Sequence, residues 1–163
     1  MSLNSPHPIW SSAKSNPYEV TKSVVQARML SGRYRTEYLC RHWSNRDGTC
    51  LASSCTGLQH PETIEHILLF CPSYSEIRSC HFNRWKSFAE KYQYLSSIIS
   101  KVLTYQPPYR CQFILDCTVT PDVISLSQIH GQAAVDKLLY LTRTFCYAVH
   151  RLRMKNLGRW SVC

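Results

Sequence analysis

The sequence has no long hydrophobic run and no recognisable leader. No stretch of its 163 residues approaches the ~18 consecutive apolar residues of a membrane-spanning helix. Residues 1–12 have neither the basic start nor the apolar stretch of a signal peptide. We therefore expect a protein without membrane association that resides inside the cell, in the nucleus or the cytoplasm.

Sequence motifs of catalysis are missing as well. The chain has no Gly-rich phosphate loop, no Gly-x-Ser-x-Gly turn, and no pair of metal-binding acids in a polymerase or nuclease setting. Asp116 and Asp122 lie six residues apart without partners, and we interpret them as surface or capping residues. We expect a protein that is not an enzyme.

Acidic residues are scarce relative to basic ones. Ten Asp and Glu face nineteen Lys and Arg, which gives a formal charge of +9. Such an excess indicates an anionic partner rather than a fold, and Arg in particular pairs with phosphate through two parallel hydrogen bonds. We expect the partner to be RNA or DNA.

Cysteine is plentiful, with nine residues, and four positions stand out. The pattern Cys50-x4-Cys55-x10-His66-x4-Cys71 supplies the three thiolates and one imidazole of a closed structural zinc site. Four protein ligands leave no open position, so the ion would hold shape rather than activate water. The alternative interpretation is that the three cysteines are ordinary thiols and His66 lies on a helix surface.

The spacing of the second ligand pair constrains the local backbone. Five steps of an α-helix rotate His66 and Cys71 about 140° past a full turn, so both cannot face one ion from a continuous helix. Pro72 disfavours the helical conformation at Cys71, so we expect Cys71 just beyond the helix end. Rival ligands are Cys40, His42 and His60, whereas Cys80, Cys111, Cys117 and Cys146 fall in apolar helical contexts and are predicted to lie in the core.

Helical periodicity dominates the remaining sequence. Asn16 and Pro17 are typical of a helix start, and an apolar stripe including Leu138, Phe145 and Leu152 predicts a long final helix. The fold class is therefore mostly α, an irregular helical domain with one small Cys3His zinc knuckle. We predict a disordered tail or linker over 1–15, basic N-terminal helices over 16–48, the zinc knuckle over 49–72, and a C-terminal helical region over 73–163.

Basic residues gather in two places. The first group precedes the zinc loop and is interleaved with Tyr38 and Trp43, a combination suited to stacking bases and holding phosphates. The second lies on the final helix, where a basic ridge recurs every four residues and could track a phosphate backbone. The candidate nucleic-acid-binding residues are Arg28, Arg33, Tyr34, Arg35 and Arg41 in the first group, and Arg143, Arg151, Arg153, Lys155 and Arg159 in the second.

Both groups also have a simpler interpretation. The arginines would then be solvated helix faces, and Tyr38 and Trp43 would be core residues. The whole chain would in that case be a zinc-stapled helical protein-interaction module with no nucleic-acid role. Binding to oligonucleotides distinguishes the two interpretations.

One stretch resembles a known family. Residues 27–36, Ala-Arg-Met-Leu-Ser-Gly-Arg-Tyr-Arg-Thr, precede the two knuckle cysteines, the run Glu-Thr-Ile-Glu-His at 62–66, and Cys-Pro at 71–72. This order is similar to the region downstream of the reverse transcriptase domain in non-LTR (LINE-like) retrotransposons. Residues 142–146 and 157–160 also resemble the tail of such elements, so the similarity spans about 24–160 with gaps.

The resemblance implies a zinc-stabilised domain that helps a polymerase hold its template RNA and target DNA. It implies Cys50, Cys55, His66 and Cys71 as the zinc ligands, and an upstream polymerase domain of a parent polyprotein as a partner. The sequence contains neither the Tyr-x-Asp-Asp motif of the polymerase palm nor an endonuclease. We therefore expect a fragment, a decayed copy or a gene derived from that tail.

Overall fold

Helices form the regular structure of the protein in the computed structural model, which describes residues 6–13, 16–90 and 93–158. Within these ranges there is no strand, only an isolated antiparallel bridge between Thr49 and Pro61. The predicted mostly-α class is thus confirmed. The α-helices are α1 (Pro8–Ser11), α2 (Pro17–Leu30), α3 (Glu37–Cys40), α4 (Ser75–Glu90), α5 (Gln93–Thr104), α6 (Pro107–Leu115), α7 (Pro121–His130) and α8 (Gln132–Asn156). Four shorter turns are η1 (Ser53–Cys55), η2 (His66–Phe70), η3 (Pro72–Tyr74) and η4 (Cys117–Val119).

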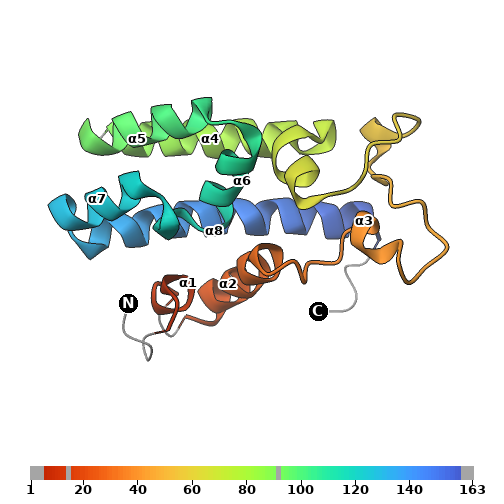
Figure 1. Ribbon diagram of the computed structural model, residues 1–163, viewed down its shortest axis with the longest axis horizontal. Helices are drawn as coiled ribbons and strands as arrows, with labels where there is room; N and C mark the ends of the chain where they lie inside the picture. Colours follow the sequence, from red (N-terminus) through yellow and green to blue (C-terminus); the bar gives the residue numbers. More distant parts are fainter. Residues whose placement is uncertain (1–5, 14–15, 91–92, 159–163) are drawn as a thin grey trace.

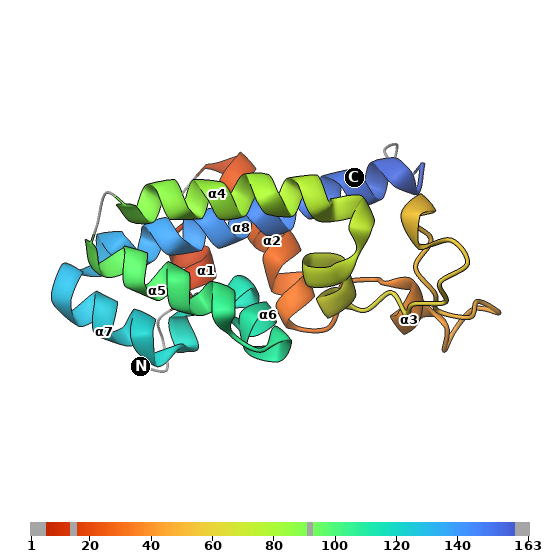
Figure 2. The same cartoon turned by 90° about the horizontal axis from the view of Figure 1, so that it is seen from above.

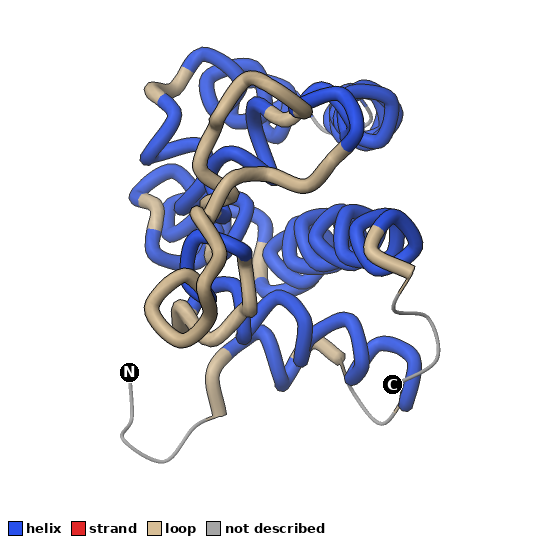
Figure 3. The backbone as a smooth tube through the Cα atoms, turned by 90° about the vertical axis from the view of Figure 1, so that its right-hand side faces the viewer, coloured by secondary structure: helices blue, strands red, loops and turns tan. Residues whose placement is uncertain are grey.

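The long helix α8 runs through the middle of the molecule. Figure 1 shows α4 and α5 along one side of it and α1 and α2 along the other, with α6 and α7 beside it. The view from above in Figure 2 places the irregular segment that follows α3 at one end of this bundle. Figure 3, seen from that end, shows this segment crossing in front of the helices.

Aromatic side chains fill the centre of the bundle. Phe145 on α8 packs edge-on against Trp85 of α4, with ring centroids 5.9 Å apart, and Trp85 also contacts Phe113 of α6 at 6.3 Å. All three rings are buried. Leu138 and Phe145 of the predicted stripe are both buried, whereas Leu152 packs at the edge of the core. The helical period read from the sequence therefore identifies the face of α8 that enters the core.

Residues 6–13 correct the prediction of a disordered tail over 1–15. Pro8–Ser11 form α1, and Ile9 is only 1 % exposed. Arg143 of α8 donates to Ser12 Oγ at 2.9 Å, and Ser23 of α2 donates to the Ile9 carbonyl at 3.0 Å. Hydrogen bonds from both neighbouring helices thus hold α1 in place; residues 1–5 and 14–15 of the predicted tail lie outside the described residues.

A single hydrophobic core crosses the predicted segment boundaries. It includes Met29 from the 16–48 segment, Ile67 and Leu68 from the knuckle, and Trp85 and Phe145 from the C-terminal region. The knuckle is therefore built into the same core as the helices. None of the described helices combines the length and the apolar character that crossing a bilayer would require.

Candidate metal centre and the basic surface beside it

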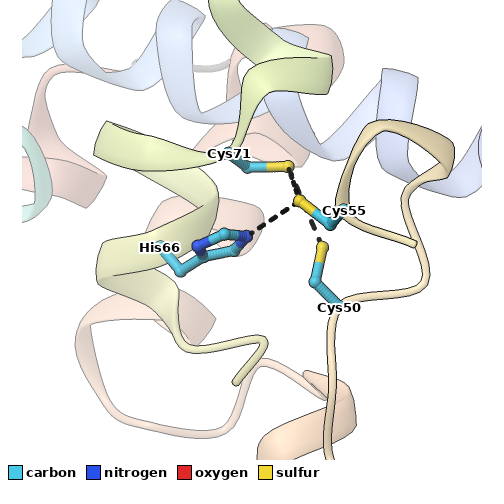
Figure 4. Close-up of side chains that lie close together, drawn as sticks. All are labelled: Cys50, Cys55, His66 and Cys71. Atoms are coloured by element: carbon cyan, nitrogen blue, oxygen red, sulfur yellow. Dashed lines mark hydrogen bonds between the residues drawn. The ribbon is translucent and has the colours of Figure 1, made fainter. Parts of the chain in front are cut away.

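The four predicted ligands converge on one point (Figure 4). Cys55 Sγ lies 3.5 Å from both His66 Nε2 and Cys71 Sγ, and Cys50 Sγ lies 3.8 Å from Cys71 Sγ. One donor atom from each residue fits within 4.8 Å of the others, and all four side chains are buried. These separations are too long for a disulfide, whose sulfurs are about 2.05 Å apart. The arrangement could hold a metal ion, as the sequence predicted.

The donor separations also fit tetrahedral coordination. Bonds of about 2.3 Å to sulfur and 2.0–2.1 Å to nitrogen, at tetrahedral angles, place two sulfurs ~3.8 Å apart and a sulfur and a nitrogen ~3.6 Å apart. Three of the six donor separations, 3.5–3.8 Å, match these values, and all six lie within 4.8 Å. The four side chains could therefore hold a single metal ion between them.

A wide helical turn brings His66 and Cys71 together. η2 is a π-helix, and the Cys71 amide donates to the His66 carbonyl at 2.7 Å, the five-residue bond of that helix type. Cys71 itself has an extended ψ of 122°, so the turn ends there as Pro72 requires. The position of Cys71 beyond the helix end is confirmed. The π-turn was not predicted, and it places the two ligands above one another where an α-helix would separate them.

The other two ligands come from an irregular loop pinned at its base. The Cys50 amide donates to the His60 carbonyl at 2.8 Å, and the Glu62 amide donates to the Gly48 carbonyl at 3.0 Å. η1 then carries Cys55 back over this base. The loop thus presents both sulfurs toward η2 (Figure 4).

Gly48 is the tightest point of this loop. Its φ is +81°, and a Cβ built on it would lie 3.1 Å from the Tyr38 Cα of α3 and 3.2 Å from Arg41 Cδ. Gly57 has a nearly equal φ of +82°, but a Cβ there would meet no described atom within 4 Å. Comparing an alanine substitution at Gly48 with one at Gly57 therefore separates the cost of the left-handed backbone from the cost of steric crowding.

We expect Gly48→Ala to destabilise the protein more than Gly57→Ala. Alanine at either position must adopt the left-handed backbone conformation, which costs about 1–2 kcal/mol. Only Gly48→Ala must in addition push α3 away from the loop. Urea unfolding of the two variants measures the difference. Equal midpoints would contradict the close approach of Gly48 to α3.

Burial and neighbouring charges set the protonation of the ligands. Burial, followed by the repulsion from His60, lowers the pKa of His66, which favours the neutral imidazole that binds metal. Burial also raises the pKa of the Cys55 thiol, whereas the hydrogen bond with Cys50 lowers that of Cys71. Because a metal binds thiolates, its binding at neutral pH would release protons from this cluster.

Arg78 lies against the cluster and was not foreseen. Its Nη2 donates to the Cys71 carbonyl at 2.7 Å, while its buried Nη1 has no hydrogen-bond partner among the described residues. Burial lowers the pKa of this guanidinium, and the charge of Cys71 opposes that effect. Three thiolates and a divalent ion carry a net charge of −1, which the Arg78 cation would offset.

The rival ligands stay outside the cluster. In the part of the chain that the structure describes, the only group of three or more His, Cys, Asp or Glu donors arranged for a metal is the predicted one. His60 comes nearest, with its ring centroid 5.6 Å from that of His66, and Cys40 and His42 belong to or follow α3. Of the four cysteines predicted in the core, Cys111, Cys117 and Cys146 are buried; Cys80 is exposed on α4, which corrects that prediction.

A buried ion-pair network joins the knuckle to the rest of the fold. Arg153 of α8 donates from Nε to Glu62 Oε1 at 3.0 Å and from Nη2 to Oε2 at 2.7 Å. Glu62 Oε2 also accepts the Glu37 amide at 2.6 Å, which fixes the start of α3. The Glu37 carboxylate in turn pairs with Arg46 at 2.6 Å. One carboxylate, Glu62, therefore ties the knuckle to α3 and α8.

Three candidate nucleic-acid contacts are corrected by burial. Arg143 is 2 % exposed and paired with Glu19 at 2.9 Å, and Arg153 is 3 % exposed and paired with Glu62. Tyr34 is buried as well, where its hydroxyl hydrogen-bonds His150 Nδ1 at 3.0 Å. These side chains hold elements together and are not presented to a ligand.

The other basic candidates are exposed. Arg28, Arg33, Arg35 and Arg41 lie at the surface after or near the end of α2, and Arg151 and Lys155 do so on α8. Arg159 lies outside the described residues.

The two basic groups, separate in sequence, meet in space. Arg153 lies 5.5 Å from the centre of the Tyr34 ring, and His150 bonds the Tyr34 hydroxyl. Burial lowers the pKa of His150, and the charges of Arg153 and Arg28 lower it further. The last turns of α8 therefore run against the basic segment that follows α2, at the knuckle end of the molecule (Figure 1).

No protein-family model matches the chain, and neither the curated proteins nor the solved structures give a significant match.

Proposed function

We propose that this protein is a zinc-stabilised nucleic-acid-binding domain without catalytic activity. The observation that carries the proposal is the placement of a buried Cys3His cluster and of exposed arginines from two chain segments at the same end of the helical bundle. The ion would fix the loop, and the loop would fix the cationic surface.

Zinc suits this cluster better than other metals. Three thiolates and one imidazole in tetrahedral array are typical of zinc, and a closed site with four protein ligands is structural. Three of the donor separations, 3.5–3.8 Å, agree with those that zinc bond lengths and tetrahedral angles imply. The ion would supply structural cross-linking only, because no coordination position is left for water or substrate.

Nucleic acid suits the surface because arginines predominate among the exposed charged side chains between α2 and the knuckle, where Asp47 is the exposed acid. Arg33 and Arg35 have no ion-pair partner among the described residues, and Arg41 stacks over the Tyr38 ring at 3.6 Å. Unpaired guanidinium groups beside aromatic rings favour phosphate and base contacts. The resemblance to the region downstream of non-LTR reverse transcriptases, where such a domain would hold template RNA and target DNA, points to the same function.

A salt titration tests the proposal. If the six exposed candidates contact phosphates of single-stranded RNA or DNA, the slope of log K against log salt is about −4 between ~50 and ~200 mM. We expect the double variant Arg151→Gln/Lys155→Gln to weaken binding and to reduce that slope by about 1.4. Fluorescence anisotropy with labelled oligonucleotides gives both quantities.

The matched control removes one Arg and one Lys elsewhere. Arg84→Gln/Lys86→Gln lies on the exposed face of α4 and should leave the slope unchanged. Absence of any binding at ~50 mM salt would overturn the proposal and leave the zinc-stapled protein-interaction module. Equal slopes for the two double variants would remove α8 from the binding surface.

A further inference from the structure

A cationic pocket lies where α2 passes into α3. Its volume is about 690 Å³, within the ~300–1,000 Å³ range of small-ligand sites. The wall combines three guanidinium groups, an indole and an apolar edge. Lining residues include Arg33, Arg35, Leu39, Cys40, Trp43 and Arg46.

The backbone before α3 aims two of these arginines outward. Tyr34 and Thr36 are buried, whereas Arg33 and Arg35, which alternate with them along the chain, are exposed. Thr36 caps α3 by accepting the Leu39 amide at 3.1 Å, and Tyr34 is anchored to His150. Both arginines therefore project from a segment held by its inward-facing neighbours.

The third guanidinium group, that of Arg46, is held in place by a buried carboxylate. Arg46 Nη1 donates to the buried carboxylate of Glu37 at 2.6 Å, while the side chain remains 47 % exposed. Its other N–H groups can thus face a ligand. Glu37 is already occupied by Arg46 and lies beneath the pocket, so the pocket itself presents net positive charge.

Trp43 is the unusual member of the pocket. It is 76 % exposed, the highest value among the exposed large apolar side chains of the described residues. The imidazole of His42 lies roughly perpendicular to it, with ring centroids 6.3 Å apart, and leaves most of the indole exposed. A free indole face beside guanidinium groups matches a base next to its phosphates.

We propose that this pocket binds one unpaired nucleotide of a single-stranded RNA or DNA, with its base stacked on Trp43 and its flanking phosphates on Arg33 and Arg35. This inference rests on the proposed nucleic-acid function and gives it a site and a strand preference. Bases paired within a duplex keep their faces covered, so only an unpaired base can stack on the indole.

Replacing Trp43 tests the stacking. We expect Trp43→Ala to weaken binding of an oligothymidylate or oligouridylate of about 12 nucleotides roughly tenfold, the effect of one lost base–aromatic stack, and to leave duplex binding unchanged. Trp43→Phe should fall between Trp43→Ala and the wild type. The control Trp10→Ala removes another exposed indole, on α1 away from the pocket, and should bind like the wild type.

Direct contact is read from the indole N–H resonance of Trp43 in NMR spectra, identified as the signal that Trp43→Phe lacks. It should shift with the single strand and stay in place with a duplex of equal length. Arg33→Gln/Arg35→Gln should reduce the single-strand salt slope by about 1.4, against no change for Arg84→Gln/Lys86→Gln.

The outcomes separate this inference from the proposed function. If the wild type binds neither strand form at ~50 mM salt, the nucleic-acid function falls and the pocket assignment falls with it. If the wild type binds, but Trp43→Ala matches Trp10→Ala and the Trp43 resonance is unmoved, only the pocket is wrong. If Trp43→Ala weakens binding and the Trp43 resonance shifts, comparing the oligothymidylate with the oligouridylate decides between DNA and RNA as the source of the strand.

Discussion

Replacing Cys55 with serine is expected to abolish stoichiometric metal binding and to unfold the knuckle around it. Cys55 Sγ is the donor that lies 3.5 Å from both His66 and Cys71, so its loss opens the centre of the cluster. Loss of a structural metal is among the changes that cost more than about 4 kcal/mol, a fall in melting temperature of roughly 10 °C for a chain of this size. Metal analysis of the purified protein should give about one zinc per wild-type chain and far less for the variant.

The position of the damage is as informative as its size. Hydrogen exchange should show lost protection over 49–74, whose loop has few regular hydrogen bonds, while α4 and α8 keep protection from the Trp85–Phe145 core. Cys80→Ser is the matched control because that thiol is exposed on α4, and its effect should stay within ~0.5 kcal/mol. A Cys55→Ser protein with the metal content and melting temperature of Cys80→Ser would show that the cluster binds no structural ion.

The features of the fold and of the site that were predicted from the sequence depend on local chemistry. Asn16 accepts the Tyr18 and Glu19 amides, as the cap rules predict, because that bond needs only neighbouring residues. The cluster of four candidate ligands was predicted because metal coordination restricts residue types and spacing so strongly. The π-turn between His66 and Cys71 was missed, since it depends on how Ile67 and Leu68 fit the core.

The basic residues show where such reasoning fails. Spacing along α8 does not indicate whether an arginine meets an acid, because that acid comes from a distant part of the chain. Glu19 lies 124 residues from Arg143 and Glu62 lies 91 residues from Arg153, so no pattern within α8 points to either. Arg143 and Arg153, which were predicted to contact nucleic acid, instead form buried ion pairs that link distant parts of the chain.

The aromatic residues show the same limit. Tyr34 and Trp43 lie nine residues apart in one Arg-rich stretch, yet the first is 6 % exposed and the second 76 %. The hydroxyl of Tyr34 finds a partner in His150, 116 residues further along, and this contact turns the ring inward. Trp43 follows α3 in a loop and has no comparable anchor among the described residues. Composition alone assigned both to the same surface.

Replacing Arg153 with methionine should destabilise the fold by about 3–5 kcal/mol, the cost of breaking a buried ion pair by removing one partner. The burial of Arg153 by itself lowers its pKa, but the hydrogen bonds and charge of Glu62 outweigh this and raise the pKa above its usual value. Without the guanidinium, the buried carboxylate of Glu62 loses its counter-charge, and that of Glu37, 4.0 Å from Arg153, loses a second cation. Urea unfolding measures the loss, and Arg151→Met, an exposed site on the same helix, is the matched control with an expected change within ~0.5 kcal/mol.

A double-mutant cycle identifies the cause. Because Glu62→Leu removes the stranded carboxylate, the double variant Arg153→Met/Glu62→Leu should be more stable than the sum of the single effects implies, with a coupling energy of about 1–3 kcal/mol. Glu62 also holds the Glu37 amide, so recovery should be incomplete. Since Glu62 lies four residues before His66, Arg153→Met should in addition weaken zinc affinity, which chelator competition measures. Additive single effects with unchanged zinc affinity would mean that α8 and the knuckle are packed together without being held by this pair.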